Sequence, residues 1–127
     1  ANMPVRAMYM SNAPQYFDFT KQFRANIAAL PFDEKSVMLH TLTRGAFGYA
    51  DKYYHYNVQP GLNFQDWMAN SRLRKLTQIL RHRTLSKIQG FSTMEKGPAD
   101  IPKPKPRKKK KKKKRKAKKA KTVTAPK

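Results

Sequence analysis

The sequence contains no cysteine and no long apolar run. The absence of cysteine excludes a disulfide framework and a thiolate metal site, and it disfavours a small secreted protein held together by disulfides. No apolar stretch approaches the roughly 18 to 20 residues that cross a bilayer, so we expect no transmembrane helix. The chain is therefore expected to gain its stability from packing or from partners.

Acidic residues are also scarce, and the charge imbalance is concentrated in the C-terminal tail, residues 103–127. The 127 residues include 29 Lys or Arg against 7 Asp or Glu, which gives a formal net charge of +22. The tail holds sixteen of the basic residues and no acid, and residues 1–102 are left with a net charge of +6. A chain this basic is typical of proteins that bind polyanions.

Seven consecutive lysines, residues 108–114, form the centre of this tail. The segment has no apolar positions to bury, so we expect it to be disordered when it is alone. A tail that engages six or more phosphates would lose about a thousandfold in affinity between about 50 and 200 mM salt, because counterion release drives such binding. Lysine dominates and no aromatic residue is interleaved, which predicts contact with phosphates without base reading. A solvated tail, a nuclear-localisation signal or a segment for an acidic membrane surface remain alternatives.

Helical periodicity is the main pattern before the tail, and no segment shows a convincing strand pattern. The first predicted helix has Asn12 as its cap, Pro14 in its first turn and Pro31 after its end. Its apolar residues recur at three- and four-residue steps, at Tyr16, Phe19, Phe23, Ile27 and Leu30. This spacing predicts an amphipathic helix with one apolar face.

Two further helices are predicted. The second opens at Asp33, a good N-cap. Its apolar stripe comprises Leu39, Leu42, Ala46, Tyr49 and Tyr53. The third runs from a capping arrangement at Asn63 and Asp66 towards Ile88, with Gly90 as its C-terminal stop. Its apolar stripe comprises Leu73, Leu76 and Leu80.

These elements predict an all-α fold, a small three-helix bundle followed by a Pro-rich linker and an extended polybasic tail. The expected boundaries are an N-terminal extension at 1–11, a three-helix domain at 12–90, a Pro-rich linker at 91–106 and a lysine-rich RNA-binding tail at 107–127. The domain has more aromatic residues than the core of a small three-helix bundle needs, so some of them are expected to contact another macromolecule. The plainer alternative is that most of them lie in the core or are half-exposed.

No pattern for catalysis or metal binding is found in the sequence. His40, His55 and His82 are widely spaced, and none has a carboxylate at ligand spacing. The chain contains no Cys-x-x-Cys, no His-Glu-x-x-His and no glycine loop for phosphate. We therefore expect a protein that is not an enzyme and that has no cofactor and no metal site.

The third predicted helix supplies a second basic surface, whose residues leave the leucine stripe free for packing. These candidates for RNA binding are Arg72, Arg74, Lys75, Arg81, Arg83 and Lys87. A helix face that is merely solvated is the alternative. The tail supplies the remaining candidates, which are Arg107, Lys108, Lys109, Lys110, Lys111, Lys112, Lys113, Lys114, Arg115, Lys116, Lys118, Lys119 and Lys121.

Two short motifs resemble the LYR family of mitochondrial proteins. QFRANIAALP at 22–31 resembles the Leu-Tyr-Arg opening of that family, and TRGAF at 43–47 is similar to its later Arg-x-x-Phe element. The segment WMANSRLRKLTQIL falls where the family has its last core helix, so the resemblance covers about residues 14–88.

The LYR resemblance implies a three-helix bundle that receives the acyl chain of mitochondrial acyl carrier protein. By position, the residues that would contact this carrier are Phe23, Arg24, Arg44 and Phe47. Read without the resemblance, Phe23 lies on the apolar stripe of the first helix and Arg24 is solvated beside it.

The function predicted from these features is that of a structural component of a large ribonucleoprotein. We expect a mitochondrial ribosomal protein that binds rRNA or other structured RNA through the tail and the basic third helix, and that contacts neighbouring proteins of the complex. One alternative is a LYR-type adaptor that binds acyl carrier protein in a respiratory complex or an assembly factor. A second alternative is a histone-like DNA-binding protein. The expected location is the mitochondrion, and the alternative location is the nucleus or cytoplasm. The sequence does not distinguish RNA from DNA.

Overall fold

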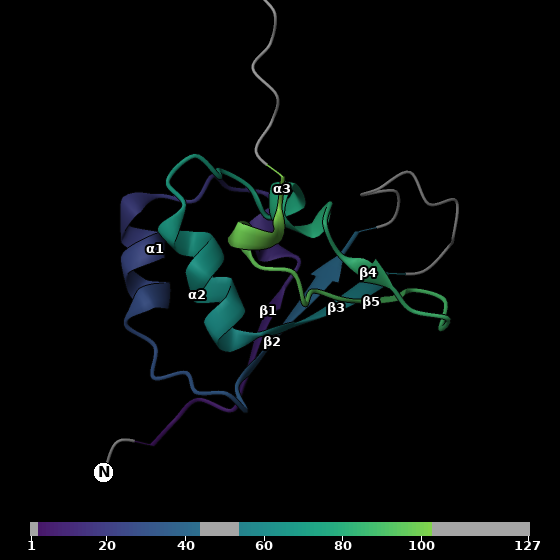
Figure 1. Cartoon of the computed structure of the whole chain (residues 1–127), viewed down its shortest axis with the longest axis horizontal. Helices are drawn as coiled ribbons and strands as arrows, with labels where there is room; N and C mark the ends of the chain where they lie inside the picture. Colours follow the sequence, from purple (N-terminus) through teal and green to yellow (C-terminus); the bar gives the residue numbers. More distant parts are fainter. Residues whose placement is uncertain (1–2, 44–53, 103–127) are drawn as a thin grey trace, which may run out of the picture.

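The computed structural model describes residues 3–43 and 54–102, whose helices lie against a five-stranded mixed sheet (Figure 1). The strands are β1 (Ala7–Ser11), β2 (Val37–Leu42), β3 (His55–Pro60), β4 (Thr84–Leu85) and β5 (Phe91–Thr93). The helices are α1 (Lys21–Ala28), α2 (Gly61–Ala69) and α3 (Leu76–Leu80), with 3₁₀ turns η1 (Ala13–Gln15) and η2 (Pro98–Asp100). The prediction of an all-α three-helix bundle is therefore wrong.

The sheet has the strand order β1-β2-β3-β5-β4, so β3 is its central strand. β1 runs parallel to β2 and β3 runs parallel to β5, whereas the β2–β3 and β4–β5 pairs are antiparallel. β1 lies in the segment expected to be an N-terminal extension, and β5 and η2 lie in the segment expected to be a linker. Strands from segments on both sides of the predicted helical domain therefore complete the sheet.

The first predicted helix exists only in its second half. Its true N-cap is Thr20, whose hydroxyl accepts a hydrogen bond from the Phe23 amide at 3.0 Å, and the predicted cap Asn12 precedes η1 instead. Ile27 is buried, as its place on the predicted stripe requires, but Tyr16 lies before the helix and is 69% exposed. The apolar spacing therefore located the packed face and misplaced the start of the helix.

The second predicted helix is wrong, because its first half forms β2. Asp33 begins a tight turn in place of a helix, since its carboxylate accepts a hydrogen bond from the Lys35 amide and its carbonyl accepts one from the Ser36 amide, both at 3.0 Å. β2 then pairs with β1 on one side and with β3 on the other. These pairings override the coincidental helical spacing of Leu39 and Leu42. The rest of the predicted stripe, Ala46, Tyr49 and Tyr53, lies outside the described residues.

The third predicted helix is broken into two helices and a hairpin. α2 ends at Ala69, and the short α3 and the β4–β5 hairpin follow. Leu76 and Leu80 are fully buried and Leu73 packs against the core, so the leucine stripe is internal although one continuous helix does not carry it. Gly90 has φ of +74° in the hairpin turn, a backbone conformation that favours glycine, and does not end a helix.

The hydrophobic core lies between the sheet and the helices. Its buried members are Phe19, Ile27, Met38, Leu42, Phe64, Trp67, Met68, Leu76, Ile79, Leu80 and Met94. Two side chains of α2 fasten this helix to its neighbours. The Gln65 amide donates to the carbonyls of Ile27 and Leu30 at the end of α1, at 2.9 and 3.0 Å, and the Trp67 indole donates to the Lys96 carbonyl at 3.0 Å.

A row of polar side chains is also buried under the helices. His55, Asn57 and Gln59 of β3 alternate with exposed or half-exposed residues, and Asn57 pairs in register with His40 of β2 and Ser92 of β5. The Ser92 hydroxyl accepts a hydrogen bond from the Asn57 amide and shares one with His55 Nε2, both at 2.9 Å. The helix-facing side of the central strand is therefore polar.

His40 is a buried titratable group of β2 that lies beside this row. Burial lowers its pKa to about 4. The Gln59 side chain opposes part of this lowering, although it makes no hydrogen bond with either ring nitrogen. His40 packs against Phe64, with ring centroids 5.2 Å apart. The ring is therefore neutral in the folded protein at physiological pH.

Acidification is predicted to destabilise the fold through His40. The unfolded chain gains a proton on this ring below its ordinary pKa of 6.5, whereas the folded chain gains it only near pH 4. The free energy of unfolding should therefore fall by about 2 kcal/mol between about pH 7.5 and pH 5 through this group. Urea unfolding followed by the fluorescence of Trp67 measures this loss, and His40→Gln should reduce it by the same amount. An unchanged pH dependence in His40→Gln would contradict the assignment.

Gly61 is predicted to be intolerant of a side chain. A Cβ atom at this position would lie 2.8 Å from Cγ of Phe32 and 3.0 Å from Cβ of Ser36. Gly61→Ala should therefore lower the free energy of unfolding by about 1 to 3 kcal/mol in urea unfolding. Gly97→Ala is the matched control, because its Cβ would meet Asp100 Oδ2 at 3.5 Å and Asn63 Nδ2 at 3.8 Å, which are ordinary contact distances. Equal losses in the two variants would show that crowding is not the cause.

Candidate nucleic-acid interface

The six basic residues predicted between positions 72 and 87 lie on several elements, and no single helix carries them. Arg72, Arg74 and Lys75 lie in the connection between α2 and α3, Arg81 follows α3, and Lys87 lies in the β4–β5 hairpin. All five are exposed. The sixth, Arg83, is half-buried before β4. The helix that was expected to align them is absent, so their proximity depends on the fold of this connection.

Three of these residues gather in one place, which we call the α3 basic patch (Arg74, Lys75 and Arg81). They line an open depression of about 290 Å³ together with Asp18, Thr77 and Gln78. Nη2 of Arg74 lies 3.1 Å from the Asp18 carboxylate, and Nζ of Lys75 lies 3.8 Å from it. One carboxylate faces three cations, and exposed ion pairs of this kind are weak. The patch therefore keeps a net positive charge that phosphate can use.

A neighbouring histidine adds no charge to this region at neutral pH. Burial lowers the pKa of His82, and the positive charges of Lys96 and Arg81 lower it further. The ring lies stacked on Trp67, with centroids 5.8 Å apart and planes inclined by 11°. His82 therefore supports the packing of α2 beside the α3 basic patch.

Arg83 has a structural contact that sequence reasoning did not foresee. Its Nη1 donates to the carbonyl of Leu80 at 2.9 Å, at the C-terminal end of α3. This contact satisfies a carbonyl that a helix end leaves without an intrahelical partner. The predicted tail residues, from Arg107 to Lys121, lie outside the described residues, and their role stays a prediction.

The two described residues that the LYR resemblance singled out are engaged within the fold. Nη1 of Arg24 donates to the carbonyls of Met68 and Asn70 at 2.6 and 3.0 Å, and its Nη2 donates to the carbonyl of Leu73. Arg24 therefore binds the end of α2 and the turn after it, and it is not simply solvated. Phe23 stacks on Phe19, with centroids 5.2 Å apart.

The three-helix bundle that the LYR resemblance implies is not the fold of this chain. Arg44 and Phe47, the other two residues carried over from that family, lie outside the described residues. Contact of this chain with an acyl carrier protein stays a prediction.

The sheet face away from the core, which we call the open face, is lined mainly by apolar residues, and the Glu95 carboxylate lies at the end of β5, where it accepts a hydrogen bond from Thr93 at 3.1 Å. Pleating and strand register place on it Ala7, Tyr9, Val37, Leu39, Thr41, Tyr56, Val58, Thr84, Phe91 and Thr93. None of the described strands contains Lys, Arg, Asp or Glu. Tyr9 is 60% exposed and Tyr56 is 44% exposed. The open face therefore presents aromatic rings to its surroundings.

Sequence reasoning missed this surface because β3 has the reverse of the usual pattern. In HYNVQP the polar residues His55, Asn57 and Gln59 face the helices, and Tyr56 and Val58 face outward. An alternation with polar residues inside does not look like an amphipathic strand with an apolar inner face. The alternation of polar and apolar residues in β3 could have identified a strand. It was not recognised because the polar residues, and not the apolar ones, face the core.

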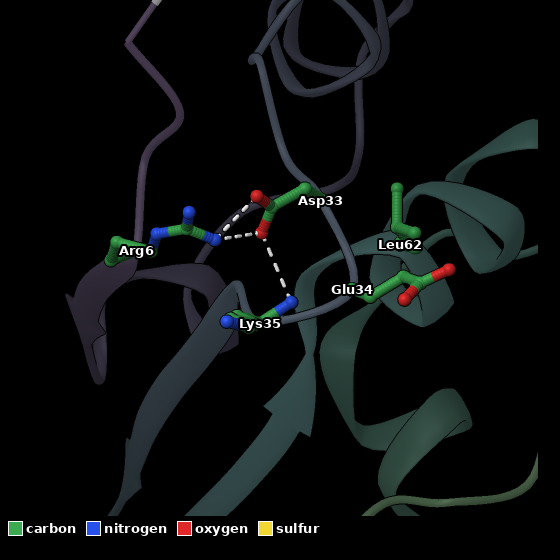
Figure 2. Close-up of a pocket in the computed structure, with 5 residues that line it drawn as sticks. All are labelled: Arg6, Asp33, Glu34, Lys35 and Leu62. Atoms are coloured by element: carbon green, nitrogen blue, oxygen red, sulfur yellow. Dashed lines mark hydrogen bonds and ion pairs between the residues drawn. The ribbon is translucent and has the colours of Figure 1, made fainter.

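A second depression, of about 430 Å³, lies where β1 and β2 begin (Figure 2). Arg6, Asp33, Glu34, Lys35 and Leu62 line it, and Arg6 forms an ion pair with Asp33. Desolvation raises the pKa of Asp33, but hydrogen bonds from the Lys35 amide and the Ser36 hydroxyl and the Arg6 charge bring it below its ordinary value. Charges of both signs line this depression, so it does not select an anion.

Within residues 3–43 and 54–102, no group of three or more His, Cys, Asp or Glu side chains could hold a metal ion. Over the same residues, no helix is both long enough and apolar enough to cross a membrane.

Residues 1–95 match the family model described as Domain of unknown function (DUF7790), and the chain belongs to this family. A comparison with curated proteins found no match. The matched segment contains all five strands and the three α-helices, and it ends before the lysine-rich tail. The family match therefore covers the sheet and the helices that pack on it.

Arg24 is predicted to stabilise the fold through its bonds to the end of α2. Arg24→Ala should lower the free energy of unfolding by about 2 to 3 kcal/mol, because it leaves carbonyls without a charged donor. Urea unfolding monitored by Trp67 fluorescence measures the loss. Lys21→Ala is the control on the same helix, since Lys21 is exposed. A loss no larger than that of Lys21→Ala would contradict the structural role of Arg24.

Proposed function

We propose that this member of the DUF7790 family is a structural RNA-binding component of a large ribonucleoprotein, and that it acts by neutralising phosphate charge. The observation that carries this proposal is the composition of residues 103–127, which hold sixteen Lys or Arg and no acid. A block of ammonium groups this dense gains free energy from phosphates, because each contact releases condensed counterions.

The folded domain supports this proposal by fixing the point from which the tail departs. Met94 is fully buried, and the side chain of Trp67 holds the Lys96 carbonyl. Asn63 donates to the Glu95 carbonyl at 3.3 Å, and Ile101 packs against the core. A tail anchored in this way is tethered to the domain, so phosphates bound by the tail also bring RNA to the domain surface.

The α3 basic patch supports the same function at the surface of the domain. Its three cations are exposed, and among the residues that the structure describes only the Asp18 carboxylate lines the depression with them. Arginine suits this role because its planar guanidinium can hold a phosphate through two hydrogen bonds. The tail is proposed to supply most of the affinity, and the patch to orient the domain on the RNA backbone.

The salt dependence of RNA binding tests the proposal. The affinity of the full chain for a structured RNA should fall about a thousandfold between about 50 and 200 mM salt, if six or more phosphates are engaged. Fluorescence anisotropy at several salt concentrations measures the slope. Removal of residues 103–127 should flatten that slope, while the urea midpoint of the domain should stay unchanged because every described helix and strand lies before residue 103.

A variant of the α3 basic patch tests whether the patch contributes to the salt dependence of RNA binding. Joint replacement of Arg74, Lys75 and Arg81 by Gln should reduce the slope by about one for each phosphate that the variant no longer binds. An affinity that does not change with salt would refute the proposal. Sequencing the nucleic acid that crosslinks to the chain in cells identifies the particle, and recovery of DNA alone would refute an RNA function.

A further inference from the structure

The open face carries aromatic rings on strands that contain no charged residue. Tyr56 and Phe91 lie opposite each other in the β3–β5 register, and Tyr9 lies on β1 next to Leu39. The Tyr9 hydroxyl is hydrogen-bonded to Thr41 Oγ1 at 2.8 Å, which orders that ring on the sheet. The face therefore offers aromatic positions on two strands that lie about 10 Å apart, which is two strand spacings.

The reversed polarity of β3 indicates that this face has an occupant. Apolar side chains gain free energy from burial, yet β3 turns Tyr56 and Val58 outward and buries His55, Asn57 and Gln59. The neighbouring β2 adds Leu39 and Val37 to the same face. A contiguous apolar face of this kind is typical of an interaction surface.

The charge of the chain determines which occupant the face suits. A second copy would carry the same net charge of +22 and would be repelled. A nucleic acid is attracted by that charge, and its bases have π faces that stack on exposed aromatic rings. Unpaired bases can reach such rings, whereas paired bases are enclosed in the duplex.

We propose that the open face binds unpaired bases of single-stranded RNA, which stack on Tyr9 of β1 and on the Tyr56–Phe91 pair of β3 and β5. This inference deepens the proposed function and rests on it for the nature of the polymer. The tail contacts phosphates in any RNA, and the open face adds a preference for unpaired segments. The hydroxyls of Thr41 and Thr93 are engaged within the fold, by Tyr9 at 2.8 Å and by the Glu95 carboxylate at 3.1 Å, so the rings are the groups proposed to contact the bases.

The test uses the full chain and two probes of equal charge, a single-stranded RNA decamer and the same decamer without bases. Tyr9→Leu and Tyr56→Leu keep an apolar side chain and remove a ring. Each should weaken binding of the decamer about tenfold at fixed salt. Binding of the abasic decamer should not change. Tyr16→Leu is the matched control, because Tyr16 is 69% exposed and does not lie on a strand.

Two further measurements keep the proposal falsifiable. Tyr9→Phe and Tyr56→Phe retain the rings and should retain decamer binding. The urea midpoint of the Tyr56 variants should match the wild type, whereas the Tyr9 variants lose the hydrogen bond to Thr41 and are compared with each other, since Tyr9→Phe and Tyr9→Leu share this loss. Photocrosslinking of a decamer that contains 5-iodouridine should attach RNA to peptides that contain Tyr9, Tyr56 or Phe91. Crosslinks confined to the tail would overturn the inference.

The possible failures are distinguishable. If both probes bind with a steep salt slope and the tyrosine variants do not change decamer binding, the inference fails and the proposed function stands. If neither probe binds in a salt-dependent way, the proposed function fails as well. Sedimentation could instead show that the wild type is a dimer and that the tyrosine variants are monomers with unchanged decamer binding. The open face would then join two copies, and the inference would be overturned.

Discussion

The reversed polarity of β3 is the constraint on which the rest of this structure depends. β3 is the central strand of the sheet, and it buries His55, Asn57 and Gln59 beneath the helices. The same pleat turns Tyr56 and Val58 away from the core, since successive side chains point to opposite faces. A shift of one residue in register would reverse these faces, bury the tyrosine and expose the polar row. The two-layer arrangement and the character of the open face thus follow from one strand.

The helices are fixed by side chains that satisfy each other's backbone ends. Arg24 of α1 donates to carbonyls at the end of α2, and Gln65 of α2 donates to carbonyls at the end of α1. Short helices gain little from propensity alone and depend on packing and capping of this kind. The two helices therefore stabilise each other on the sheet, where Figure 1 shows them side by side. This arrangement leaves the opposite face of the sheet without a helix of the described chain.

The parts that were predictable from the sequence were those set by local composition. The basic tail can be read directly, and the internal position of Leu76 and Leu80 followed from their spacing. The sheet could not be found in this way because its pairings are distant in sequence, as in the β1–β2 pair, and because Leu39 and Leu42 also fit a helix. Tyr56 was missed because the inner face of β3 is polar, and Tyr9 was missed because β1, AMYMS, has apolar residues on both faces and so shows no alternation.

The folded domain and the tail carry complementary chemistry. The tail supplies charge without aromatic rings, and the strands supply rings without charge. Nuclear magnetic resonance of the full chain during titration with a single-stranded RNA tests this division most directly. The account predicts upfield shifts of the ring protons of Tyr9, Tyr56 and Phe91, as bases stack on them. Shifts confined to the lysines of the tail, with the ring signals unmoved at saturation, would contradict it.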